Sequence, residues 1–120
     1  MNKESFLRQK GVNIDAALNY TGDFETYNEI LGDFMMELDN QISNLTSVKE
    51  NNDMPNYAIQ VHALKGNVRC LGFDSYADIA YNHEMASKQN DVNYVNEHYN
   101  EILTFVNNLK ALYEEYKNIN

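Results

Sequence analysis

Cysteine is almost absent from the chain: its 120 residues contain a single one, Cys70. One cysteine excludes an internal disulfide and is typical of a reducing compartment, so we expect a cytoplasmic location, with Cys70 buried as a small apolar residue. Long hydrophobic runs are also missing. None approaches the ~20 residues of a transmembrane helix, and the first residues contain no long apolar segment of a secretory signal. The sequence therefore predicts a protein without membrane contact.

Basic residues are scarce. The chain has 9 Lys and Arg against 18 Asp and Glu, which gives a net charge of −9. An acidic protein is a poor match to a nucleic-acid backbone, so we expect no nucleic-acid partner. On such a background the few cations that surround a candidate site carry more weight than their number suggests.

Proline occurs once and glycine five times, which favours long uninterrupted helices. Apolar residues recur at alternating spacings of three and four, and strand patterns are absent. The predicted fold is all-α: an antiparallel up-down-up-down four-helix bundle with a short N-terminal helix or arm. We interpret 1–120 as one domain, with the arm and short helix in 1–22 and the bundle in 23–118. Helix boundaries are expected at Asp23, at the break 51–55 with Pro55, at Gly72, and at Asn90-Asp91.

The segment 62–72, HALKGNVRCLG, contains the strongest functional signal. Its helical stripe is apolar and is expected to be buried; it comprises Tyr57, Val61, Leu64, Val68 and Leu71. His62 lies next to this stripe, so its ring should reach solvent. Its neighbours on the helix surface are Ala58, Ile59, Lys65, Gly66 and, two turns on, Arg69. An exposed imidazole is a nucleophile when it is unprotonated, and here it has a cation beside it and a glycine that leaves room for a partner.

This segment resembles the signature of histidine-containing phosphotransfer (HPt) domains, His-x-Leu-Lys-Gly followed by Leu/Ile-Gly. His62, Leu64, Lys65, Gly66, Leu71 and Gly72 match it, and the same four-helix bundle is implied. The resemblance implies that His62 is the phosphoacceptor of a two-component phosphorelay. The implied partners are a response-regulator receiver domain, a hybrid sensor histidine kinase, or both. No cofactor is expected on this chain, because Mg²⁺ would be bound by the receiver. With no Gly-rich nucleotide loop, the chain is interpreted as a phosphocarrier and not as a kinase or other enzyme.

Glu84 is the second candidate. It lies eleven residues after Phe73, near the centre of a helix-helix link, and His62 lies eleven residues before it, so both should be level in a tight hairpin. Glu84 matches a Glu that is common in the family and that can orient the histidine. We expect it to fix the tautomer of His62; the alternative is an ordinary solvated acid, and in either case Glu84→Ala should leave the fold intact. Lys65 is expected to offset phosphate charge, with Arg69 and Lys88 beside it; the alternative for each is a solvated helix face.

The predicted docking surface comprises Ala58, Ile59, Gly66, Arg69 and Lys88 around His62. His83 replaces the Leu that is usual in the family, and its inward position predicts a hydrogen-bonded core histidine; His98 is expected to be solvated. Two other functions are compatible with a helical bundle. A di-iron or zinc site needs Glu-x-x-His or His-x-x-x-His spacing, and no histidine here has it, so no metal is expected. A non-catalytic helical-bundle interaction adaptor remains as the alternative.

Overall fold

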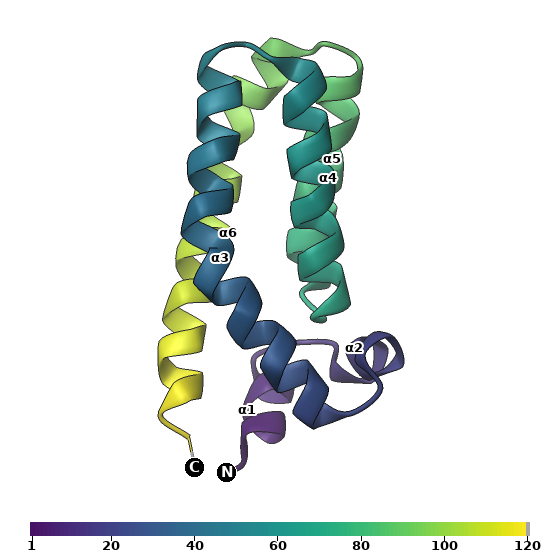
Figure 1. The fold of residues 1–120 in the computed structure, drawn as a ribbon, viewed down its shortest axis with the longest axis vertical. Helices are drawn as coiled ribbons and strands as arrows, with labels where there is room; N and C mark the ends of the chain where they lie inside the picture. Colours follow the sequence, from purple (N-terminus) through teal and green to yellow (C-terminus); the bar gives the residue numbers. More distant parts are fainter. Residues whose placement is uncertain (120) are drawn as a thin grey trace.

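The computed structural model describes residues 1–119 and is entirely helical over them, which confirms the predicted all-α class. Six α-helices follow one another without an intervening strand in this part of the chain (Figure 1). Their bounds are α1 Lys3–Gln9, α2 Ile14–Thr21, α3 Phe24–Glu50, α4 Met54–Cys70, α5 Asp74–Lys88 and α6 Val92–Lys117. Residue 120 of the predicted domain lies outside the described residues.

The helix boundaries follow from capping residues in the sequence. The side chains of Asp23, Asp53 and Asp91 accept hydrogen bonds from backbone N–H groups in the first turns of α3, α4 and α6. These bonds satisfy donors that have no partner inside the helix. Pro55 lies in the first turn of α4, where its missing N–H costs nothing. The predicted boundaries at Asp23, Pro55 and Asn90-Asp91 are confirmed.

The helices form an elongated body of 44 × 25 × 20 Å. The most extensive helix-helix packing is between α4 and α5; α5 also packs on α6 and α3 on α4 (Figure 1). The core is continuous along this body, and every residue of the stripe predicted for α4 is buried in it. One detail differs from the prediction: Cys70 is only partly buried. None of the helices over the described residues is both long and apolar enough to cross a membrane.

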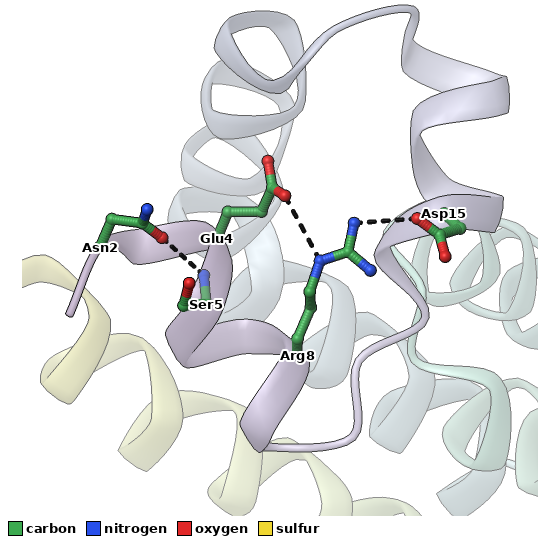
Figure 2. A network of polar contacts seen from close by, with 5 residues as sticks. All are labelled: Asn2, Glu4, Ser5, Arg8 and Asp15. Carbon is green, nitrogen blue, oxygen red and sulfur yellow. Dashed lines mark hydrogen bonds and ion pairs between the residues drawn. The ribbon is translucent and has the colours of Figure 1, made fainter.

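The N-terminal helices lie at the end of the body where α4 is followed by α5. Arg8 of α1 pairs with Glu4 and with Asp15 of α2, at 3.3 and 2.8 Å, and Asn2 caps α1 through the N–H of Ser5 (Figure 2). The segment between α1 and α2 reaches the α4-α5 turn, where the N–H of Asn13 donates to the carbonyl of Gly72 at 2.8 Å. The predicted N-terminal arm and short helix are therefore two short helices: α2 packs on α3 and α4, and α1 packs on α2 and α6.

Candidate functional site

His62 lies on α4, one residue after the fully buried Val61, and its side chain is 64% exposed. The predicted exposure of the imidazole is confirmed. Its Nδ1 lies 2.7 Å from Oε2 of Glu84 on α5, so the two residues meet across the α4-α5 interface as their equal offsets from Phe73 predicted. The site therefore pairs a nucleophile that solvent and partners can reach with a carboxylate from the neighbouring helix.

Glu84 is buried: only 2% of its side chain is exposed, so its interpretation as an ordinary solvated acid is wrong. Glu84→Ala was predicted to leave the fold intact as an exposed substitution. Because Glu84 is buried, that prediction has no basis. A signal for this burial is present in the sequence. Ala77, Ala80, Glu84 and Ser87 recur at spacings of three, four and three, and all are buried. Ala77, Ala80 and Ser87 are small, so α5 can approach α4 closely, and Glu84 is buried by this close approach.

Three nitrogen atoms surround the Glu84 carboxylate. Lys65 Nζ lies 2.7 Å from Oε1, while Lys88 Nζ at 2.9 Å and His62 Nδ1 share Oε2. Burial by itself would raise the pKa of this carboxyl, but the contacts with Lys65, Lys88 and His62 outweigh it and lower the pKa to about 2. Glu84 is therefore an anion at every pH near neutrality.

The ionised carboxylate decides the tautomer of His62. A carboxylate can only accept hydrogen bonds, so Nδ1 of the neutral ring must carry the proton that it donates to Oε2. The lone pair is then on Nε2, the other ring nitrogen. This arrangement gives the exposed ring a defined nucleophilic atom.

The cations of the site are not equivalent. Lys65 was expected to extend beside His62, but its side chain is only 14% exposed; the ammonium pairs with Glu84 and lies 5.5 Å from the ring centroid of Tyr81. Lys88 is 57% exposed, so its ammonium contacts Glu84 and solvent together. Arg69 is exposed and forms no ion pair with any residue that the structure describes. Lys88 and Arg69 are thus the cations most open to an incoming anion.

The predicted docking residues fall into two groups. Ala58 and Ile59 line one surface depression together with His62, Glu84 and Lys88. Ile59 is exposed in it, whereas Ala58 is buried and contributes little surface, contrary to expectation. Gly66 lies on α4 one turn after His62, and a Cβ placed there would meet nothing within 4 Å. The space that the sequence predicted beside His62 is therefore present.

His83 is fully buried, which confirms the predicted core position. Its Nδ1 lies 2.9 Å from the hydroxyl of Tyr57 on α4, and its Nε2 lies 3.1 Å from the carbonyl oxygen of His98 on α6. Burial lowers the pKa of this imidazole. His98 is less solvated than predicted, because its ring is partly buried and stacks on Tyr94 at 4.1 Å between centroids. Across residues 1–119 no three or more His, Cys, Asp and Glu side chains gather in a metal-binding arrangement.

Comparison with known proteins agrees with this geometry. A family model described as Hpt domain matches residues 29–118, which is three quarters of the chain. The matched range begins within α3 and includes both His62 and Glu84. Neither the curated proteins nor the solved structures gave a match to the chain.

Proposed function

The chain belongs to the Hpt domain family, and we propose that it carries a phosphoryl group on His62 between the partners of a two-component phosphorelay. Domains of this family are phosphocarrier modules that act in phosphorelays and interact with receiver domains and kinases. In the proposed reaction His62 accepts the phosphoryl group from a receiver-domain aspartate or from a hybrid sensor histidine kinase. It then passes the group to the aspartate of a receiver.

The contact between His62 and Glu84 is the observation that carries this proposal. The lone pair of Nε2 attacks the phosphorus of the aspartyl phosphate, the new N–P bond forms, and the bond from phosphorus to the aspartate oxygen breaks. The leaving aspartate departs as a carboxylate. The ring keeps its proton on Nδ1 and becomes a phosphoimidazolium, whose positive charge the Glu84 carboxylate stabilises at 2.7 Å. Reversal of the same steps returns the group to the next receiver.

Charge and access support the same role. A loose phosphoryl transfer spreads negative charge over the three equatorial oxygens, and exposed cations stabilise it. Lys88 is open to solvent beside the ring, Arg69 is open to solvent two turns further along α4, and Lys65 acts through Glu84. The proposed docking surface comprises Ile59, Gly66, Arg69 and Lys88, with Ala58 at its buried edge.

The protein needs no cofactor of its own in this proposal, because Mg²⁺ is bound by the receiver. It transfers a phosphoryl group without ATP-dependent kinase activity and is therefore a carrier, not an enzyme. A cytoplasmic location suits this role and the single cysteine.

We also propose that α3 to α6 form one antiparallel up-down-up-down bundle, with 1–22 as an N-terminal arm and 23–118 as the bundle of a single domain. Short links support this: three residues join α3 to α4 and another three join α4 to α5. The pairwise packing of α3 on α4, α4 on α5 and α5 on α6 supports it as well (Figure 1).

The experiment is phosphorylation by an isotopically labelled, phosphorylated receiver domain. We expect label that is lost in acid, kept in base and mapped to His62 alone. His62→Gln should abolish it, while His98→Gln, at another histidine that is not fully buried, should not. Label that persists in His62→Gln, or no label from any of a panel of receivers, would overturn the proposal and leave the interaction adaptor as the function.

A further inference from the structure

The side chain of His83 forms hydrogen bonds from α5 to both α4 and α6. Among the described residues it is the only side chain of α5 that does so. Its Nδ1 meets the hydroxyl of Tyr57 on α4 at 2.9 Å, and its Nε2 meets the carbonyl oxygen of His98 on α6 at 3.1 Å. His83 is fully buried and directly precedes Glu84. The link therefore lies beside the carboxylate that orients His62.

The directions of these two hydrogen bonds follow from their partners. A carbonyl oxygen can only accept, so Nε2 of His83 carries the proton and donates it to the His98 carbonyl. Nδ1 of the neutral ring is then an acceptor, and the Tyr57 hydroxyl donates to it. Both ring nitrogens are satisfied without a charge, which makes the complete burial of this polar side chain possible.

This link fixes the rotation of α5 about its axis. Successive residues of an α-helix are about 100° apart, so a rotation that carried Glu84 toward solvent would also draw the His83 ring out of its two bonds. Burial of the Glu84 charge is costly, and this cost favours a movement of the carboxylate toward solvent. Two of its three partners, His62 and Lys88, are more than half exposed and have room to follow it outward. Of the three partners only Lys65, 14% exposed, holds Glu84 within the interface, and the His83 link adds a second anchor.

We propose that His83 is a positioning residue for phosphotransfer: by holding α5 against α4 and α6, it keeps Glu84 in place to fix the His62 tautomer. The proposal rests on the proposed function of His62 for its consequence in transfer. Its structural part, the effect of His83 on the protonation of the His62 ring, does not require that any phosphoryl group be transferred.

The test uses the full chain and two readouts. The first is the tautomer of His62, read from the ¹⁵N chemical shifts of its ring nitrogens in the unphosphorylated protein. The second is the rate at which His62 is phosphorylated by phosphoramidate, a small donor that releases ammonia and needs no docking surface. In His83→Leu we expect a lower fraction of the Nδ1–H tautomer and a rate lower by about fivefold, the equivalent of one neutral hydrogen bond.

Two variants test the direction of the effect. His83→Gln retains an N–H donor for the His98 carbonyl and should recover part of both readouts. Tyr57→Phe removes only the hydroxyl on the α4 side, so it should shift the tautomer as His83→Leu does, and it decides the matter if His83→Leu fails to fold. The matched control is Tyr99→Phe, which removes a partly buried hydroxyl on α6; this hydroxyl bonds to Thr46 of α3 at 2.7 Å, and the bond does not involve α5.

The outcomes are distinct. A tautomer shift in His83→Leu and Tyr57→Phe, with none in Tyr99→Phe, supports the proposal even if no receiver phosphorylates the protein. A folded His83→Leu or Tyr57→Phe with the wild-type tautomer and rate would overturn it. An equal shift in Tyr99→Phe would also overturn it, since any loss of core packing would then have the same effect.

Discussion

The ammonium nitrogen of Lys65 lies 2.7 Å from Oε1 of Glu84, on the side of the carboxylate away from the oxygen that His62 contacts. The motif lysine therefore serves first to hold the carboxylate. A buried carboxylate that loses its partner keeps the cost of desolvation without the compensating attraction. The stability of the α4-α5 interface and the orientation of the nucleophile depend on the same ion pair.

Lys65→Met should accordingly destabilise the fold. We expect a loss of about 3 kcal/mol in the free energy of unfolding, because removal of one partner from a buried pair typically costs that much. Urea denaturation followed by circular dichroism measures it. The matched control is Lys110→Met, which breaks the exposed ion pair with Asp39 and should cost no more than about 1 kcal/mol. Equal losses in the two variants would contradict the structural role of Lys65.

Glu84→Gln should slow phosphotransfer by roughly tenfold or more, since it removes a charge-assisted hydrogen bond worth ~1.5–3 kcal/mol. The amide is neutral and offers an N–H group as well as a carbonyl, so it no longer requires the proton of His62 to be on Nδ1. Phosphorylation rates of the two proteins with the same receiver measure the effect. A variant that transfers at the wild-type rate would show that the tautomer of His62 is fixed by something else.

The pH dependence of stability follows from the same carboxyl. The pKa of Glu84 is lowered from 4.5 to about 2 in the folded protein. A carboxyl with a depressed pKa in the folded state contributes stability that is fully present above its unfolded pKa and is lost as the pH falls through the folded one. The window is therefore pH 4.5 down to 2, and the contribution is on the order of 3 kcal/mol. The difference in unfolding free energy between wild type and Glu84→Gln should shrink across this window; a difference that stays constant would contradict the assignment.

Much of the site was predictable because its geometry is helical. The offset of His62 from the buried stripe and its level with Glu84 depend only on the rise and period of α-helices, and both predictions are confirmed. The burial of Glu84 and the course of Lys65 were not predicted. They depend on how closely α5 approaches α4 and on which rotamer a long side chain adopts, and these are properties of the packed pair of helices, not of either sequence segment alone.

Gly72 likewise has one feature that the sequence predicted and one that depends on packing. The sequence predicted it as a helix end, and its φ of 90° agrees with that role. The structure adds a close approach: a Cβ here would lie 2.7 Å from the carbonyl oxygen of Asn13 and 2.9 Å from Val12. We therefore expect Gly72→Ala to lower the free energy of unfolding by about 2 kcal/mol or more, because the alanine backbone would be strained and the N-terminal segment would be displaced. Thermal unfolding tests this, with Gly11→Ala as a control at a similar positive φ, 85°, but with open space around it.

Gly66 is the opposite case and gives the sharpest test of docking. It lies on α4 within one turn of His62, its Cβ position is open, and no fold requirement for glycine is visible there. Glycine within a helix costs about 1 kcal/mol relative to alanine, so Gly66→Ala should raise the stability of the protein by about that amount.

Gly66→Gln should also fold normally, but its long side chain would occupy the space over which a receiver must approach the imidazole. We expect transfer from a phosphorylated receiver to fall sharply in Gly66→Gln, while phosphorylation by phosphoramidate stays near wild type because the small donor needs no clearance. Unimpaired transfer from the receiver would show that the partner does not approach across this face, and a loss of helical circular dichroism would show that Gly66 serves packing instead.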